Sequence, residues 1–342
     1  MTSNDFTEAD YSNAIPANEP PRQRVNILMA TFNGARNLGQ QIESIQMQSH
    51  HEWELFVSDD GSSDATPHIV SEYSKADPRI HLLPAPAVGG SAQANFLSGL
   101  TSTPSGPLML CDQDDFWFVD KVRLSVDALR GWEAAPDKPR VPRLIHTDAR
   151  VVDDELVTVH PSQKRFSGNL DQKPSLGHSL VENSVTGNTT LLSEELVELL
   201  RMTPPRTPMI MHDWWIYILA AAFGEVIYLD TVTLAYRQHA VNTVGARRKL
   251  QVPTIARMRE AKSRTAATVA QARSFLSVYG SILPPDAKNS VSTYAALTSV
   301  PRRSRITSLR RSGLTKIRPT ARLAHYASVL TLSSDGVSTA LQ

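Results

Sequence analysis

The sequence of 342 residues contains a single cysteine, Cys111. One cysteine excludes an internal disulfide bond and is typical of a reducing compartment. A hydrophobic run long enough to cross a bilayer is also missing, because the longest, Trp214–Leu229, is interrupted by Gly224 and Glu225. Residues 1–23 are polar and acidic and lack the apolar stretch of a signal peptide, so we expect a disordered leader. Together these absences predict a cytoplasmic protein.

The sequence has almost no net charge, +1, but its two ends differ. Residues 246–342 hold 17 basic and 3 acidic residues, a charge of +14, which leaves −13 for residues 1–245. This asymmetry predicts an anionic partner for the basic end. Arg302–Arg311 and Lys316–Arg322 alternate basic and apolar residues, as segments on an anionic membrane do, here the inner face of the plasma membrane. The alternative is a solvated face of packed helices. Nucleic acid is not expected, because few aromatic residues are interleaved for stacking on bases.

Strands and helices alternate along the first third of the sequence. Short apolar, β-prone runs predict strands at Val25–Thr31, Glu54–Ser58, Arg79–Leu83 and Pro107–Cys111. Apolar residues at helical spacing predict helices at Ala35–Gln48, Ala65–Lys75 and Ser91–Leu100. This alternation is typical of βαβ units, so we expect a Rossmann-like α/β fold with a mostly parallel sheet.

Three carboxylates follow the fourth predicted strand at once, at Asp112, Asp114 and Asp115. The carboxyl ends of strands in open α/β sheets are where ligands bind. Like charges this close repel each other unless a cation or hydrogen bonds hold them, and oxygen ligands suit Mg²⁺ or Mn²⁺. We therefore predict a divalent cation here. The alternative is that these residues only cap the helix expected near Asp120.

A second acidic turn follows the second strand, with Asp59, Asp60 and Asp64. Two acidic turns at the ends of neighbouring strands would open into one crevice. We expect Asp64 to cap the following helix. Another predicted strand, Arg143–Val152, places His146 and Asp148 between apolar residues, which predicts a polar, solvent-facing side for both.

Three segments together resemble a known family. ILMATFNGARNLGQQIESI, LFVSDDGSSDAT and LMLCDQDDFW, in this order and spacing, are similar to family 2 glycosyltransferases with the GT-A fold. The DQDD-x-W form most resembles their rhamnosyltransferase-like branch. The resemblance covers residues 24–245 and leaves residues 246–342 as a helical, basic C-terminal extension. It implies inverting transfer of a sugar, rhamnose for that branch, from a dTDP- or UDP-sugar to a glycan or lipid-linked glycan acceptor in cell-surface polysaccharide synthesis.

The resemblance also implies roles for residues around the nucleotide. Thr31 and Asn33 would lie near the nucleotide, in the loop after the first strand. Asp59 and Asp60 would receive the base and the ribose, because a carboxylate accepts from a pyrimidine N3–H or a ribose hydroxyl. The Gly89-Gly90-Ser91 turn precedes a helix whose N-terminus favours an anion, or it is only a loop.

A metal site is implied by the same resemblance. Asp114 would ligate the ion, and Asp112 would bind the ribose or a metal-bound water. His239 would complete the metal shell, and Arg237 would contact phosphate. Trp117 would either line the sugar pocket or pack in the core.

The catalytic base falls on Asp213, at the start of an apolar helix, by its place in the order of motifs. The alternative is a helix cap, and His212 is a weaker rival. Gly187 and Asn188 would shape the acceptor side of the cleft.

Two other functions remain open at this stage. A nucleotidyltransferase also uses an α/β domain with acidic metal sites, but no glycine-rich basic loop follows the first strand. A non-catalytic nucleotide-sugar-binding scaffold of glycan assembly would keep the fold without turnover.

Overall fold

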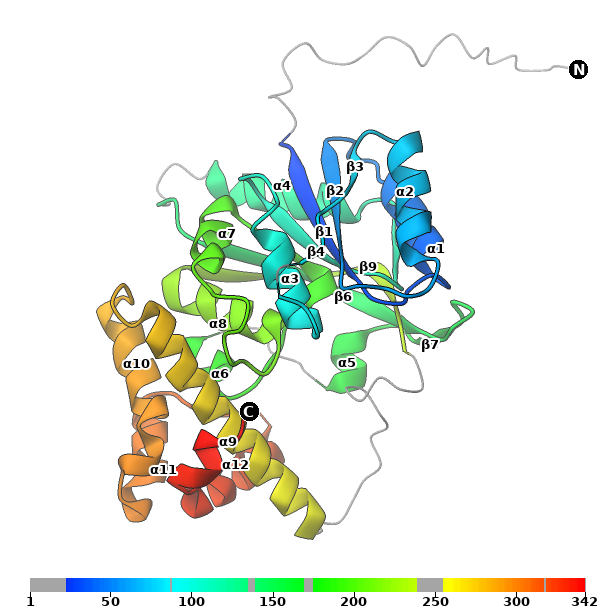
Figure 1. Ribbon diagram of the computed structural model, residues 1–342. Helices are drawn as coiled ribbons and strands as arrows, with labels where there is room; N and C mark the ends of the chain where they lie inside the picture. Colours follow the sequence, from blue (N-terminus) through cyan, green and yellow to red (C-terminus); the bar gives the residue numbers. More distant parts are fainter. Residues whose placement is uncertain are drawn as a thin grey trace, which may run out of the picture.

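The computed structural model describes residues 23–86, 88–134, 139–168, 175–238, 255–316 and 318–341. The predicted leader, apart from its last residue, and the predicted boundary between residues 245 and 246 lie outside these ranges. Within them the chain forms an α/β layer structure followed by a group of helices (Figure 1).

One sheet runs through the first part of the chain. In the described ranges it has nine strands in the order β3-β2-β1-β4-β8-β6-β9-β5, and β7 pairs with β6. The strands are β1 (Val25–Thr31), β2 (Trp53–Asp59), β3 (Ile80–Leu82), β4 (Leu108–Asp112), β5 (Phe116–Trp117), β6 (Arg143–Val152), β7 (Thr158–His160), β8 (Thr190–Leu192) and β9 (Glu225–Arg237). The predicted α/β class is confirmed.

Parallel pairing brings the predicted acidic turns together. β1 pairs in parallel with both β2 and β4, so Thr31 lies opposite Asp59 and Ala30 opposite Asp112. β8 pairs antiparallel with β4 and β6, whereas β6 and β9 are parallel. The carboxyl ends of β1, β2 and β4 therefore meet at one edge, as the strand spacing predicts.

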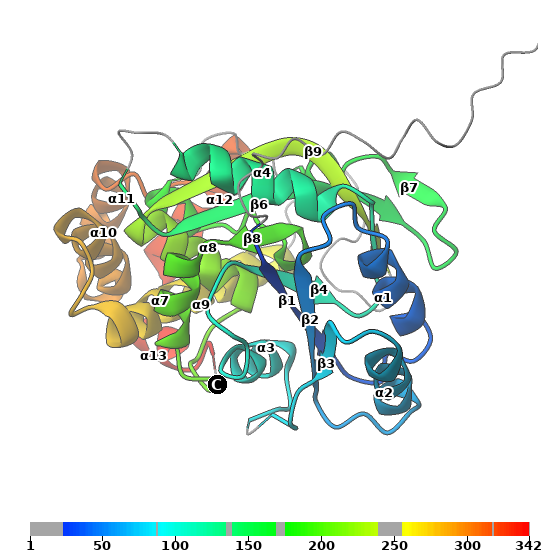
Figure 2. The same ribbon diagram turned by 90° about the horizontal axis from the view of Figure 1, so that it is seen from above.

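Helices cover both faces of the sheet (Figure 2). They are α1 (Leu38–Gln46), α2 (Thr66–Ala76), α3 (Ala92–Leu100), α4 (Lys121–Glu133), α5 (Gln163–Ser167), α6 (Leu176–Ser179), α7 (Glu194–Arg201) and α8 (His212–Phe223). Side chains alternate along a strand, so Ile27 and Met29 of β1 join the core under α1, α2 and α4. Leu28 joins the core under α3, α7 and α8 on the other face.

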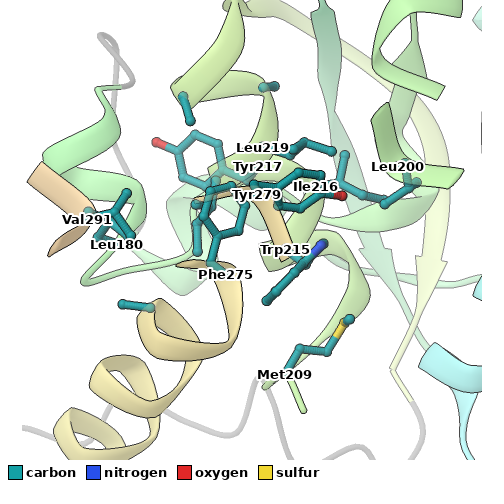
Figure 3. Close-up of a cluster of buried hydrophobic side chains, with 14 of the residues drawn as sticks. Leu180, Leu200, Met209, Trp215, Ile216, Tyr217, Leu219, Phe275, Tyr279 and Val291 are labelled. Carbon is teal, nitrogen blue, oxygen red and sulfur yellow. The ribbon is translucent and has the colours of Figure 1, made fainter. Parts of the chain in front are cut away.

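The remaining helices extend that second core. They are α9 (Ile255–Tyr279), α10 (Pro285–Ala295), α11 (Arg302–Arg311), α12 (Pro319–Thr331) and α13 (Ser334–Ser338). Trp215 of α8 stacks edge-on against Phe275 of α9, with ring centroids 5.1 Å apart, and lies 6.2 Å from Tyr279 (Figure 3). The basic residues on these helices therefore belong to elements that share the core of the sheet domain.

The prediction for His146 and Asp148 was wrong. Both are buried, at 2% and 5% exposure, because β6 lies inside the sheet between β8 and β9. The ring of His146 packs against Tyr228 of β9. The carboxylate of Asp148 accepts hydrogen bonds from the hydroxyl of Ser162 and the N–H of Lys164.

Candidate active site

A cleft of about 480 Å³ opens at the carboxyl ends of the strands. This volume lies in the range of small-molecule sites. The lining includes five of the polar residues singled out in the sequence: Thr31, Asp60, Asp112, Asp114 and Arg237. Asn33, Asp59 and Asp213 are not part of the lining. The lining also includes Tyr236, which the sequence analysis did not single out. The N-terminus of α3, for which an anion site was one of two alternatives, lines the cleft as well.

Asp60 is held at the cleft by the glycine turn before α3. One of its carboxylate oxygens accepts a hydrogen bond of 2.8 Å from the N–H of Gly90. A Cβ on Gly89 would lie 1.8 Å from the other oxygen, so only glycine allows this approach. Gly90 has a positive φ of 90° and Ser91 caps α3. The turn thus positions a cleft carboxylate as well as a helix N-terminus.

Asp59 points into its own loop. Its carboxylate accepts hydrogen bonds from the Thr31 hydroxyl at 2.9 Å and from the N–H of Ser62 at 2.8 Å. Asn33, at a positive φ of 49°, accepts from the N–H of Ser63 at 2.9 Å. Asp59 and Asn33 therefore join the loops after β1 and β2, while Thr31 and Asp60 reach the cleft.

Asp64 differs slightly from its prediction. The N-cap of α2 is Ala65, one residue later than expected, and the helix begins at Thr66. The carboxylate of Asp64 still accepts hydrogen bonds from the N–H groups of Thr66 and Ala35. The bond to Thr66 stabilises the start of α2, and the bond to Ala35 holds the loop after β1 against it.

The carboxylates after β4 separate into two kinds. Asp112 and Asp114 face the cleft, and burial, followed by the charges of Asp114 and Asp213, raises the pKa of Asp112 to about 7. Asp115 is buried away from solvent and accepts hydrogen bonds from the side chain of Asn188 and the N–H of Arg237. Burial and the neighbouring carboxylates raise its pKa well above the usual range. Asp115 links β5, β9 and the turn at Asn188.

The two cleft carboxylates suit a hard divalent cation. Oxygen donors at one open cleft are what Mg²⁺ and Mn²⁺ prefer, and a bound cation would offset the repulsion that raises the pKa of Asp112. No group of three or more His, Cys, Asp or Glu side chains gathers for a metal anywhere in the described ranges. The predicted ligand His239 lies outside those ranges. Asp112 and Asp114 are thus the donors that the described site can offer.

The structure places Trp117 in the core and Arg237 at the cleft. Trp117 packs in the core at 1% exposure, with the ammonium of Lys121 4.6 Å from its ring centre, so it does not line the cleft. Arg237, 3% exposed, lines the cleft and donates hydrogen bonds to the side chain of Gln40 and the carbonyl of Asp154. These bonds fix a cationic group beside the carboxylates.

Asp213 is the second residue of α8, whose N-cap is Met211. Its carboxylate accepts from the N–H of Trp214 at 2.6 Å, from the amide of Asn183 at 3.2 Å and from the N–H of Gly187. Burial nevertheless raises its pKa to about 6. A carboxylate with this pKa, fixed by three donors, is suited to accept a proton near neutral pH.

Sequence reasoning missed Asn183 and Tyr236 as site residues. Asn183 is close in sequence to Gly187 and Asn188, which were expected at the acceptor side of the cleft, but its partner Asp213 is thirty positions away. Tyr236 lines the cleft, and burial, together with the charges of four carboxylates, raises the pKa of its hydroxyl. The hydroxyl therefore stays protonated and is able to donate. Alternation along β9 was the only signal for it.

Residues 26–135 match the profile described as Glycosyl transferase family 2. They contain β1, β2 and β4 and with them Thr31, Asp60, Asp112 and Asp114. Residues 26–135 belong to glycosyl transferase family 2. No helix in the described ranges of this family 2 protein is long and apolar enough to span a membrane.

Curated relatives extend the similarity beyond the profile. The family 2 chain is 27% identical over 228 residues to the dTDP-rhamnosyl transferase RfbG of Shigella flexneri, covering 64% of this chain and 74% of that protein. It is 32% identical over 105 residues to the UDP-Glc:alpha-D-GlcNAc-diphosphoundecaprenol beta-1,3-glucosyltransferase WfgD of Escherichia coli. That second match covers 31% of this chain and only 40% of the relative.

Solved structures share the fold at low identity. TarS of S. aureus has a TM-score of 0.54 at 13% identity, covering 93% of this chain and 54% of that one. The mannosyltransferase PcManGT of Pyrobaculum calidifontis, solved with GDP-Man and Mn²⁺, has a TM-score of 0.50 at 17% identity, covering 94% and 88%. The predicted GT-A fold is confirmed for this family 2 glycosyltransferase.

Proposed function

We propose that this glycosyltransferase is an inverting, metal-dependent enzyme that transfers rhamnose from dTDP-rhamnose to a glycan of the cell surface. The observation that carries the proposal is the cleft itself. Asp60, Asp112 and Asp114 line it, and the half-buried Asp213 is close enough to Asp112 for their charges to interact. These are a nucleotide-binding carboxylate, a cation-binding pair and a base.

The donor is inferred from chemistry and from a relative. A carboxylate such as Asp60 accepts a hydrogen bond from the N3–H of thymine or uracil or from a ribose hydroxyl, so both a dTDP- and a UDP-sugar satisfy it. The relative named as a dTDP-rhamnosyl transferase favours the first. The WfgD name, which specifies a diphosphoundecaprenol acceptor, supports a lipid-linked glycan as acceptor.

The proposed reaction is a single displacement. An acceptor hydroxyl bound beside Asp213 gives its proton to that carboxylate as its oxygen attacks C1 of the sugar, and the bond from C1 to the diphosphate breaks. Arg237, fixed by two hydrogen bonds, offers positive charge to the leaving diphosphate. A Mg²⁺ or Mn²⁺ held by Asp112 and Asp114 would supply further positive charge there.

The basic extension supports a second partner. Arg302, Arg303, Arg310 and Arg311 are exposed on α11, whereas Arg305 and Leu309 of the same helix are buried. No ion pair joins the four exposed arginines to any residue in the described ranges. We propose that this face of α11 meets the anionic surface on which a lipid-linked acceptor lies.

The first experiment combines donor binding and turnover. Purified protein with Mg²⁺ or Mn²⁺ is incubated with a panel of nucleotide-sugars, and thermal stabilisation and nucleotide release are measured. We expect dTDP-rhamnose to stabilise the protein and Asp114→Asn to remove the stabilisation, while Asp127→Asn, an exposed change on α4, leaves it intact. Stabilisation without nucleotide release in the presence of acceptor would support the scaffold instead. No stabilisation by any nucleotide or nucleotide-sugar would contradict the proposed donor site.

A further inference from the structure

Asp115 is a buried carboxylate to which the proposed reaction gives no role. It is 1% exposed and does not line the cleft, although Asp114 beside it does. Oδ1 of Asp115 accepts a hydrogen bond of 3.2 Å from the N–H of Arg237, and Oδ2 accepts from the side-chain amide of Asn188. Burial of a carboxyl group costs free energy unless hydrogen bonds compensate for it. These two bonds join Asp115 to segments that lie 122 and 73 positions away.

The bond to Asn188 reaches the proposed base through one neighbouring residue. Asn188 lies in the 3₁₀ turn Gly187–Thr189, and the N–H of Gly187 donates to the carboxylate of Asp213. The turn is also in close contact with the start of α8. A Cβ on Gly187 would lie 3.1 Å from Nε2 of His212 and 3.5 Å from Cβ of Asp213. A displacement of the turn would therefore change the position or the hydrogen bonding of Asp213.

The bond to Arg237 reaches the other side of the reaction. The guanidinium of Arg237 lines the cleft and donates to the side chain of Gln40 and the carbonyl of Asp154. Asp115 accepts from the backbone N–H of the same residue, at the end of β9. Because Asp115 directly follows Asp114, this bond determines how far the cationic group lies from the cation-binding loop.

We propose that Asp115 is a positioning residue that holds Asp213 and Arg237 in place relative to the cation-binding pair, Asp112 and Asp114. The proposal rests on the proposed function, in which Asp213 accepts the proton and Arg237 faces the leaving diphosphate. Asp115 touches neither the substrate nor the reacting atoms, because it lies behind the wall of the cleft. Its effect on the reaction is carried by two hydrogen bonds.

A neutral side chain of the same shape is able to make both bonds. In Asp115→Asn, Oδ1 still accepts from the N–H of Arg237, and Nδ2 donates to the amide oxygen of Asn188 once that amide is turned over. Oδ1 of Asn188 has no hydrogen-bond partner in the part of the chain that the structure describes, so turning the amide breaks no other bond of that oxygen. Asp115→Ala, by contrast, removes both bonds. The two variants therefore distinguish hydrogen bonding from negative charge.

The test measures kcat for nucleotide release by the full chain, with dTDP-rhamnose as donor and Mg²⁺ or Mn²⁺ present. We expect Asp115→Ala to lower kcat by about 100-fold, the effect of misplaced reacting groups. Asn188→Ala removes one of the two bonds and should lower kcat by about tenfold, with the KM for the donor and the donor-induced thermal stabilisation within about twofold of the original protein. Asp115→Asn should keep kcat within about threefold. A loss in Asp115→Asn as large as that in Asp115→Ala would overturn the proposal.

A double variant tests whether the two residues act through one bond. In Asp115→Ala combined with Asn188→Ala, kcat should lie within about twofold of that in Asp115→Ala alone, because the shared bond is already absent. Losses that multiply would overturn the proposal, because they would show two independent effects.

A matched control separates positioning from general loss of stability. Thr268→Val removes a buried hydrogen bond of 2.7 Å between α9 and α10, from Thr268 to the hydroxyl of Tyr294, outside the cleft. It should lower the melting temperature and leave kcat within about twofold. A loss of kcat in this variant as large as that in Asn188→Ala would overturn the proposal in favour of general destabilisation.

The same measurements separate this proposal from the proposed function. Unchanged kcat in Asp213→Asn would overturn the base assignment and the positioning role together. A large loss in Asp213→Asn with unchanged kcat in Asn188→Ala and Asp115→Ala would overturn the positioning role alone and leave the transfer reaction intact.

Discussion

The acid limb of the pH–rate profile should report the ionisation of Asp213. Burial raises the pKa of this carboxylate to about 6, and only its ionised form accepts a proton from the acceptor hydroxyl. At pH 7 about nine tenths of the molecules carry the ionised form, and kcat should fall about tenfold for each unit below pH 6. Asp213→Asn should lower kcat by ~10²–10⁴ and leave donor-induced thermal stabilisation intact. Nucleotide release at saturating donor and metal measures the pH dependence of kcat and the loss of kcat in Asp213→Asn. Thermal unfolding with and without the donor measures the stabilisation.

Asn183 provides an internal check on the assignment. Its amide donates to the carboxylate of Asp213 at 3.2 Å and so stabilises the ionised form. Asn183→Ala removes a hydrogen bond to a charged group, which should move the acid limb upward by about one pH unit. Asp112, with its pKa of about 7, is the competing group, and its titration would be suppressed by metal. An acid limb that moves with metal concentration but not with Asn183→Ala would refute the reasoning.

Two further predictions test the geometry away from the base. Gly89→Ala would place a Cβ 1.8 Å from the carboxylate of Asp60, so we expect donor affinity, measured by calorimetry, to fall about tenfold. Gly131→Ala, in open space on α4, should instead raise the free energy of unfolding by about 0.5–1 kcal/mol, measured by thermal unfolding. Unchanged donor affinity in Gly89→Ala would contradict the placement of Asp60. Arg79, 2.8 Å from Asp77, holds the pKa of that carboxyl well below its usual range. The folded pKa is depressed, so the stabilisation is present above about pH 4 and is lost as the pH falls further. Asp77→Asn should therefore cost about 1 kcal/mol in urea unfolding at pH 7 and progressively less below pH 4, and a cost independent of pH would contradict the ion pair.

Local patterns were enough to predict the sheet edge and its carboxylates. The apolar run before Asp112 and the parallel βαβ order determine that Asp60, Asp112 and Asp114 meet, because strand ends coincide at one edge. The same rules do not show which polar residues are buried. His146 and Asp148 alternate with apolar residues as on a half-exposed strand, yet β6 is inside the sheet, a position set by strand order.

Contacts between residues that are far apart in the sequence could not be predicted either. Asp59 and Asp60 are adjacent and chemically alike, and only the folded turn at Gly90 shows that Asp60 is the one at the cleft. Asp115 is one residue beyond the metal-binding pair but bonds to Asn188, seventy-three positions away. Such contacts depend on the tertiary structure, so the spacing of residues along the chain does not predict them.

The contact of Trp215 with Phe275 and Tyr279 has a consequence for how the enzyme can be rebuilt. The apolar cluster is continuous from Leu28 in the sheet to Val337 near the end of the described chain. The sheet domain and the C-terminal helices therefore share one hydrophobic core. A chimera that exchanged only the C-terminal helices would need side chains that pack against the indole of Trp215. The donor-binding cleft and the basic surface would therefore have to be exchanged together.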